Sequence, residues 1–301
     1  MKRKIVQHGA SSLTVTLPST WVKKFGINKG DEVDVEEEGT KITVGTVSEI
    51  KSPKKMVDTS KFGIFTKNNL THLYQLGYDD IEIRFSEDNT PKEMQERVQE
   101  CIGFEIIDQK SNKIEIKSIA HTLESEFDIM LRKSFLITKD MSEEVLNAIT
   151  KKDYSKLFEL RNLEFLNNKF TMACVRILHK RGYQNPDRIM QIYDIIKGLE
   201  RIADEYKYIC DLLKEHNQEI SKDVLDYFQK INDFYSSFYK IFYKFDSELK
   251  KYIYLNRNEL RKKGRELLMK SKGKESILLS YLMRVIEKTY DAAGEYFALI
   301  L

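Results

Sequence analysis

Two pairs of acidic residues have a spacing that could bind a metal ion. Glu200 and Asp204 lie four residues apart, and Glu287 and Asp291 repeat that spacing near the end of the chain. In a helix, residues four apart share a face, so the two carboxylates of each pair repel unless solvent, a basic side chain or a metal offsets the repulsion. Carboxylate oxygens suit Mg, Mn or Fe, and they bind Zn with less preference when no thiolate or imidazole accompanies them.

The two segments that carry these pairs are copies of one pattern. In both, apolar residues recur at helical spacing. A shift of 87 residues aligns the two acidic pairs, and it also aligns the apolar stripes. The aligned apolar residues include Ile192 with Leu279, Ile195 with Leu282, and Leu199 with Ile286. We therefore predict an all-helical region, 120–301, made of two three-helix repeats, 120–214 and 215–301. Its helices are expected near 121–150, 153–180, 186–214, 218–244, 247–271 and 274–301.

The N-terminal segment has an uneven charge distribution. Residues 1–30 contain no acidic residue, whereas residues 31–38 are mostly acidic. The basic residues of this segment are Lys2, Arg3, Lys4, Lys23, Lys24 and Lys29. Alternating β-branched stretches, a short helix stopped at Gly26 and a hairpin over Gly39-Thr40 predict a small β module at residues 1–48. A module of this size buries little apolar surface alone, so we expect it to need a second copy.

The rest of the chain before residue 120 predicts a smaller domain. Residues 49–65, with Pro53 among several lysines, are expected to form a linker. Residues 66–119 follow an α-β-α-β-β pattern and predict a small α/β spacer or interaction domain. The fold class is therefore multi-domain α+β: a β module, a small α/β domain and an all-α bundle.

Composition narrows the possible functions. With 50 basic and 47 acidic residues, the formal net charge is +3, so a DNA-binding surface must come from uneven placement of charge. The three cysteines, Cys101, Cys174 and Cys210, fall at apolar helical positions and are expected to be reduced core residues. No apolar run is long enough for a signal peptide or a membrane span, and we expect a cytoplasmic protein.

The N-terminal segment resembles the swapped-hairpin DNA-binding domain of the AbrB/MazE/SpoVT family. The resemblance lies in the basic first strand RKIVQ, the strand SLTVTLP ending in Pro18, the short helix with Trp21, and the segment INKGDEVDVE. It implies a homodimer through residues 1–48 that binds double-stranded DNA. The residues that would face the DNA are Lys2, Arg3, Lys4, His8, Ser11, Ser12 and Thr14. Many relatives have arginines where this chain has Ala10-Ser11-Ser12, and such arginines read bases directly.

The helical region resembles the PhoU family of phosphate-signalling regulators. LERIADEYKYI at 199–209 is similar to the hallmark stretch of that family, and VIEKTYDAA at 285–293 is a looser copy. The resemblance implies a metal site, with Fe, Mn, Mg or Zn held by Glu200, Asp204, Glu287 and Asp291. Glu164 and Asn167 on the second helix are further candidates. The whole domain order resembles archaeal phosphate uptake regulators.

Several interpretations stay open. The favoured one is a transcription regulator of phosphate uptake. Its helical region, 120–301, would sense a metal or contact a phosphate ABC transporter ATPase or a signalling kinase. A second is a signalling adaptor that dimerises through residues 1–48 and does not bind DNA. A metal-dependent phosphohydrolase is a third, but no histidine accompanies the acidic pairs and no residue is a candidate nucleophile, so we expect no enzyme. Two further alternatives involve no ligand. In residues 1–48 the basic side chains would only form a solvated strand edge. In residues 120–301 Glu200 and Glu287 would only form ion pairs with Lys197, Arg201, Arg284 or Lys288.

Overall fold

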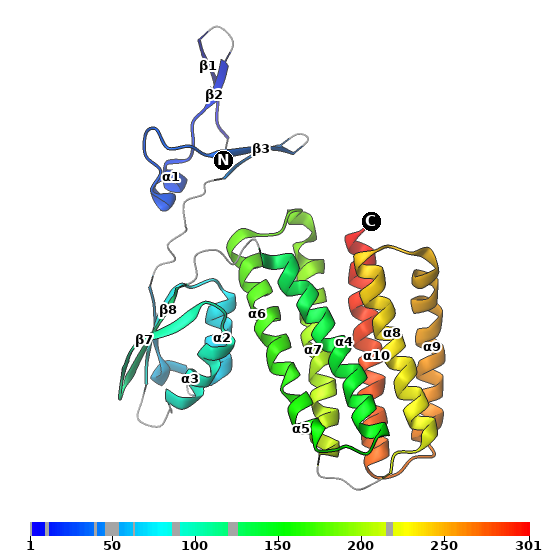
Figure 1. Cartoon of the computed structure of the whole chain (residues 1–301). Helices are drawn as coiled ribbons and strands as arrows, with labels where there is room; N and C mark the ends of the chain where they lie inside the picture. The colour runs from blue at the N-terminus through cyan, green and yellow to red at the C-terminus, as the bar shows by residue number, and fades with distance from the viewer. Residues whose placement is uncertain are drawn as a thin grey trace. The chain divides into compact units, whose positions relative to one another are not determined.

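The computed structural model divides the chain into two compact units, residues 1–52 and 53–301 (Figure 1). The residues that the structure describes are 2–9, 12–38, 41–45, 54–62, 64–85, 91–119, 126–214 and 219–301. The first unit corresponds to the predicted β module. The second unit holds both the small α/β domain and the helical bundle, which pack against each other.

The N-terminal unit, here called the head, consists of two separate hairpins and one short helix. Its elements are β1 (Ile5–His8), β2 (Ser12–Val15), α1 (Ser19–Phe25), β3 (Asp34–Glu38) and β4 (Lys41–Gly45). β1 pairs with β2 and β3 pairs with β4, both antiparallel. α1 ends at Gly26, whose φ of 63° is left-handed, a conformation that glycine adopts without a Cβ clash. The predicted strands and helix are confirmed, while the Gly39-Thr40 turn lies outside the described residues.

The middle domain has one more strand than the sequence predicts. Its elements are β5 (Lys55–Asp58), the 3₁₀ helix η1 (Thr59–Phe62), α2 (Lys67–Gln75), β6 (Asp80–Arg84), α3 (Pro91–Glu100), β7 (Phe104–Lys110) and β8 (Lys113–Ser118). β5 falls in the predicted linker 49–65, so the linker prediction is wrong from residue 55 onward. The strand is short and pairs in parallel with β6, more than twenty residues away, and such a partner leaves no local signal.

The middle domain has its own hydrophobic core between sheet and helices. The sheet order is β5-β6-β8-β7, and Ile81 and Ile83 of β6 are fully buried together with Leu70 and Tyr74 of α2. α2 and α3 lie on the side of the sheet that faces α6 of the bundle (Figure 1). The helices α2 and α3 therefore bury one face of the sheet and also dock the domain on the bundle.

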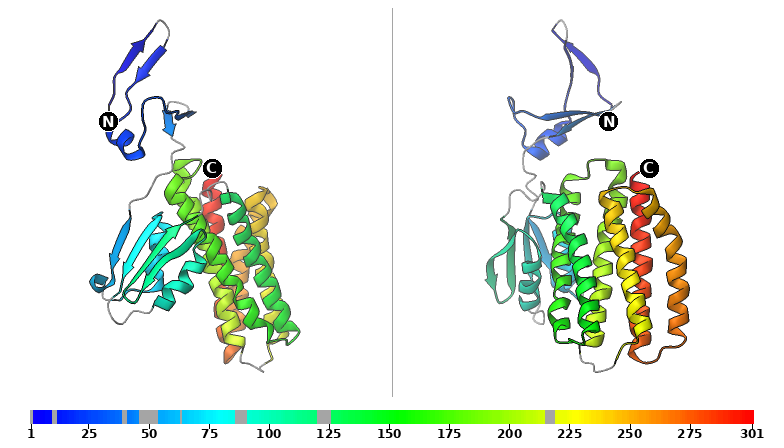
Figure 2. Two further views of the ribbon diagram at one scale, coloured as in Figure 1. Left: turned by 60° about the vertical axis from the view of Figure 1, so that its left-hand side comes forward. Right: turned by 45° about the vertical axis from the view of Figure 1, so that its right-hand side comes forward.

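The helical region forms two groups of helices as expected, seen in green to red in Figure 2, but the first group contains a fourth, short helix. Its helices are α4 (Phe127–Thr150), α5 (Lys156–Arg161), α6 (Leu163–Arg181), α7 (Ile189–Leu213), α8 (Lys222–Tyr243), α9 (Ser247–Leu268) and α10 (Lys274–Leu299). α7 and α10, which carry the acidic pairs, pack directly against each other. They approach closely at Gly198, where a Cβ would lie 3.0 Å from that of Ala292.

The predicted helix 153–180 is wrong as a single helix, because the chain breaks at Asn162. There ψ is −12°, and the Asn162 N–H donates to the Glu159 carbonyl three residues back at 3.0 Å. A bond over three residues tightens the turn and interrupts the α-helical ladder. α5 therefore packs on α7 as a separate short helix before α6 begins.

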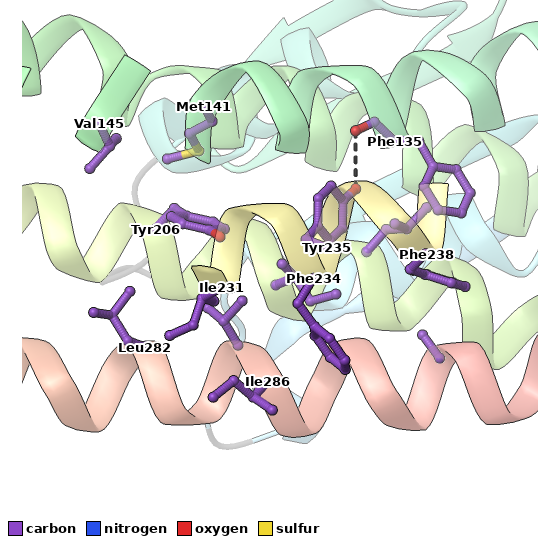
Figure 3. Close-up of a cluster of buried hydrophobic side chains, with 14 of the residues drawn as sticks. Phe135, Met141, Val145, Tyr206, Ile231, Phe234, Tyr235, Phe238, Leu282 and Ile286 are labelled. Carbon is purple, nitrogen blue, oxygen red and sulfur yellow. Dashed lines mark hydrogen bonds between the residues drawn. The ribbon is translucent and has the colours of Figure 1, made fainter. Parts of the chain in front are cut away.

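The bundle core is rich in aromatic side chains contributed by both repeats (Figure 3). The Phe135 ring of α4 lies 5.3 Å from that of Phe238 of α8, so aromatic side chains of the two repeats meet in the core. The Tyr235 hydroxyl donates to the Phe135 carbonyl at 3.0 Å. Buried phenols that keep a hydrogen bond avoid the cost of an unpaired polar group, so this bond fixes α8 on α4.

The structure also bears on two predictions made from composition, one about the cysteines and one about membrane spans. Cys101, Cys174 and Cys210 are free and buried, as predicted, and burial raises the pKa of each thiol. Among the helices that the structure describes, none combines the length and the apolar character that crossing a membrane requires.

Candidate nucleic-acid interface and acidic motifs

The β1–β2 hairpin gathers three of the predicted DNA-facing residues on one face. His8 pairs with Ser12 and Val6 pairs with Thr14 across the two strands. Residues at positions i and i+2 share a face, so His8, Ser12 and Thr14 lie together, and all are exposed. The Thr14 hydroxyl donates to the Val6 carbonyl at 3.1 Å, which fixes its orientation. Ser11 lies outside the described residues.

Five of the basic residues of the head lie at two places. Lys2, Arg3 and Lys4 directly precede β1 and are exposed. Lys23 and Lys24 lie in the last turn of α1, where positive charge also stabilises the helix dipole. The Lys24 ammonium lies 5.4 Å from the centre of the Phe25 ring. Lys23 and Lys24 thus have a local structural role, whereas Lys2, Arg3 and Lys4 present their charge to the surroundings.

The opposite face of the same hairpin carries Gln7 and three uncovered apolar side chains. Ile5, Leu13 and Val15 share this face, and their exposed fractions are 68, 71 and 55%. Among the described residues of the head none is buried, and α1 contributes no buried side chain. Because exposed apolar surface of this kind is unfavourable in water, the head presents one polar face and one face suited to a partner.

Glu200 and Asp204 are held by basic side chains. Glu200 pairs with Lys197, and the Lys207 ammonium binds Asp204 at 2.5 Å and Glu164 at 2.9 Å. Burial alone would lower the pKa of Lys207, but hydrogen bonds to Asp204 and Glu164 outweigh it and raise that pKa above its usual value. Lys207 therefore stays charged and neutralises part of the repulsion between these carboxylates.

Glu287 and Asp291 lie in different surroundings from their counterparts. Glu287 pairs with two arginines of α9: Arg257, and Arg261 at 2.8 Å. Asp291 is exposed and lines a small pocket of about 130 Å³ with Arg201 and Lys288. The two acidic pairs occupy equivalent helical positions, yet the structure does not bring them together.

Asn167 also has a structural role. It is fully buried, and its amide donates to the Ser134 carbonyl at 3.0 Å and to the Thr138 hydroxyl at 2.8 Å. These bonds tie α6 to α4, so the amide nitrogen is committed within the bundle. Its buried oxygen, Oδ1, has no hydrogen-bond partner in the described part of the chain, so a role of Asn167 as a metal ligand stays a prediction.

The structure reveals one acidic residue that the sequence reasoning missed. Glu205 is almost fully buried and binds Arg284 at 2.9 Å and also Lys288, both from α10. The signal was present, because Glu205 falls three residues after Ile202 and four before Ile209, within the apolar stripe. The basic residues expected for Glu287 therefore pair with Glu205, and they lock α10 on α7.

The acidic motifs as arranged do not fit a metal ion. Within the described ranges, no group of three or more His, Cys, Asp or Glu side chains is placed to hold one. Glu200 and Asp204 each have one carboxylate oxygen paired with a lysine, and both oxygens of Glu287 pair with arginines, so these basic side chains compete with a cation. Metal binding at these residues stays a prediction.

Comparison with known proteins bears on the N-terminal part. Residues 6–56 match the family model described as antidote-toxin recognition MazE, bacterial antitoxin. No curated protein matches the chain, and no solved structure does either. The match covers the described elements of the head and ends inside β5, so it does not bear on the bundle. The N-terminal region is similar to MazE-type domains, as the sequence predicts, and the PhoU resemblance of the bundle stays a prediction.

Proposed function

We propose that this protein is a DNA-binding transcription regulator that dimerises through its head, residues 1–48. The observation that carries the proposal is the two-faced β1–β2 hairpin within a MazE-like match. Its polar face offers hydrogen-bond donors, and the segment before it offers positive charge without a neighbouring acid. Positive charge supplies most of the affinity for the DNA backbone, while side-chain donors add limited contacts to bases.

The apolar face supports the dimer. Ile5, Leu13 and Val15 would leave water if the hairpins of two copies covered each other. Each fully buried aliphatic side chain contributes roughly 1.5–3 kcal/mol, so six such side chains in a dimer would contribute on the order of 9–18 kcal/mol to association. The polar face, with His8, Ser12 and Thr14, would stay free for DNA.

The bundle forms the regulatory half of the proposal. Two three-helix repeats with an acidic pair at equivalent positions support a role in phosphate uptake, through the resemblance to the PhoU family. The partner would be a phosphate ABC transporter ATPase or a signalling kinase that contacts the outer surface of the bundle. This part of the proposal rests on the sequence motifs of the bundle and does not depend on whether the head binds DNA.

The test is binding to fragmented genomic DNA across a salt series. We compare the protein with a variant in which Lys2, Arg3 and Lys4 are all changed to Ala. A matched control changes three exposed lysines of α9 to Ala: Lys251, Lys262 and Lys263. If the head holds DNA, the head variant should bind more weakly and lose up to about five units of log–log salt slope, because each phosphate contact contributes about 0.9 and a dimer carries two copies. The α9 control should keep the slope.

The adaptor hypothesis is the second candidate, favoured by the absence of arginine on the described polar face of the hairpin. It predicts a dimer that retains no DNA fragment even at low salt. That result would contradict the proposal of a DNA-binding regulator, and the helical bundle should then be used to search for a protein partner.

A further inference from the structure

A cleft of about 810 Å³ lies between the middle domain and the bundle. One wall comes from the start of α2 and from α3, and the other from the α5–α6 junction and α7. Cavities of this volume at domain boundaries typically accommodate small molecules. Glu200 and Asp204 line the cleft, whereas Glu287 and Asp291 do not.

The wall formed by α2 and α3 carries an excess positive charge. Arg97 and Glu100 form an ion pair at 2.5 Å and are only 8 and 7% exposed. Lys67 has no ion-pair partner within the described ranges, so it leaves this wall one positive charge in excess. The buried Nε of Arg97 also has no acceptor in the described part of the chain. An unmade hydrogen bond of a buried charged group is costly, which makes this atom a donor that awaits a ligand.

The wall formed by α5, α6 and α7 carries an excess negative charge. Lys207 is shared by two carboxylates, Glu164 and Asp204, so this cluster has one negative charge in excess. The two other charged residues that line this wall, Glu200 and Arg161, offset each other. The two walls of the cleft therefore have opposite net charge.

The negative wall also presents an acceptor that awaits a donor. The Asn168 amide nitrogen donates to Glu164 at 2.6 Å. An ionised carboxylate only accepts hydrogen bonds, so Asn168 must turn its nitrogen toward Glu164 and its oxygen away. That buried oxygen, Oδ1, has no partner among the residues described. The positive wall thus carries an orphan donor and the negative wall an orphan acceptor.

We propose that this cleft binds a small zwitterion, a molecule with an ammonium group at one end and a carboxylate or phosphate at the other. The anionic group binds Lys67 and the Nε of Arg97. The ammonium group donates to Asn168 Oδ1 and lies near the carboxylates of Glu164 and Asp204. A molecule with one charged group satisfies only one wall and leaves the other orphan atom without a partner.

The first measurement is thermal unfolding of the full chain with matched probes. 4-Aminobutyrate carries a carboxylate and phosphoethanolamine a phosphate, each with an ammonium group, so they distinguish the two anionic ends. Butyrate, inorganic phosphate and ethanolamine carry one charged group each. A ligand that binds only the folded state raises the unfolding temperature. We expect at least one zwitterion to raise it, and the three single-ended probes to leave it unchanged at equal concentration and ionic strength.

Two variants assign the effect to the cleft by calorimetric titration with the active zwitterion. Lys67→Ala removes an exposed, unpaired charge, and Asn168→Ala removes the orphan acceptor. Each should weaken binding about tenfold, because each deletes one hydrogen bond to a charged group. The matched control Lys92→Ala removes an exposed charge from α3 outside the cleft, and it should bind as the unmodified protein does.

Three results would overturn the proposal. The first is an unfolding temperature that neither zwitterion raises. The second is an equal rise with a single-ended probe, which would show that only one wall binds. The third is unchanged affinity in Lys67→Ala and Asn168→Ala while both variants unfold at the normal temperature. DNA binding by the head does not enter any of these readouts, so the inference stands or falls independently of the proposed function.

Discussion

The head and the middle domain are segments of similar length, yet they use their apolar residues in opposite ways. In the middle domain, Tyr74, Ile81 and Ile83 are fully buried between sheet and helices. In the head, Leu13 is 71% exposed, and none of its described residues is buried. A four-stranded sheet covered by helices forms a core within one chain, whereas two separate hairpins cannot cover each other. This difference supports our proposal that the head depends on a second copy for its core.

The largest expected effect of a single substitution on this difference between the head and the middle domain is at Leu13. Leu13→Glu places a charge on the apolar face of the hairpin, and we expect it to weaken dimerisation at least 100-fold, because burying an unpaired carboxylate costs several kcal/mol. Sedimentation measured over a concentration series would show monomer for the variant. Met56→Glu is the matched control, because Met56 of β5 is 56% exposed in a domain that has its own core. A Leu13→Glu protein that remains dimeric would show that the head does not form the interface.

A second prediction tests whether the middle domain is supported within its own chain. Arg176 of α6 is buried, donates to the carbonyls of Tyr74 at 2.8 Å and Tyr78 at 2.9 Å, and pairs with Asp79. Its guanidinium also lies 4.9 Å from the centre of the Tyr74 ring. Arg176→Ala should lower the free energy of unfolding by about 3–5 kcal/mol, because it leaves buried acceptors unpaired. Urea unfolding at several protein concentrations should give the same loss at each, in contrast to the head.

The matched control for that variant is Lys180→Ala. Lys180 binds the same carboxylate, Asp79, at 3.0 Å, but it is partly exposed. We expect its loss to cost less than about 1 kcal/mol, since solvent screens such pairs. Equal effects of the two substitutions would mean that Asp79 alone carries the contact and that the buried carbonyls do not.

The smallest expected effect is on the pH dependence of stability, and it involves carboxylates on the outer face of the middle-domain sheet. Glu82 lies directly opposite Glu115, and Lys54 binds both, at 3.0 and 2.6 Å. Hydrogen bonds from Lys54 and then Arg84 lower the pKa of Glu82 from 4.5 to about 2. A lowered pKa in the folded state contributes stability above the unfolded value, and this contribution is lost as the pH falls from 4.5 toward 2.

Glu82→Gln should therefore reduce the slope of unfolding free energy against pH in that acidic window, and change it little near neutrality. Chemical unfolding at a series of acidic pH values checks the slope. Glu93→Gln, on the exposed face of α3, is the control and should leave the slope unchanged. An unaltered slope in Glu82→Gln would show that the Lys54 cluster is not coupled to folding.

Much of the fold was predictable from sequence because its signals are local. The apolar stripe with Ile195, Leu199 and Ile202 predicts α7, and the same stripe repeated after 87 residues predicts α10. Gly26 predicts the end of α1, where the structure has left-handed backbone. The basic segment before β1 predicts a positively charged surface, whereas the individual residues of the candidate DNA face came from the resemblance to the swapped-hairpin family. Helical period, strand alternation and turn chemistry each span a few residues, so they can be read along the chain.

Contacts between distant segments were decided only by the tertiary structure. The sequence by itself determined which residues form the helices and that Glu200 and Glu287 hold equivalent positions. It did not determine that Lys207 of α7 would hold Glu164 of α6, or that Arg257 of α9 would hold Glu287. β5 became a strand only because β6 lies beside it, and the cleft exists only because α3 docks near α7. The physical reason is that ion pairs, parallel strands and cavities depend on how whole elements pack, and no local period encodes that register.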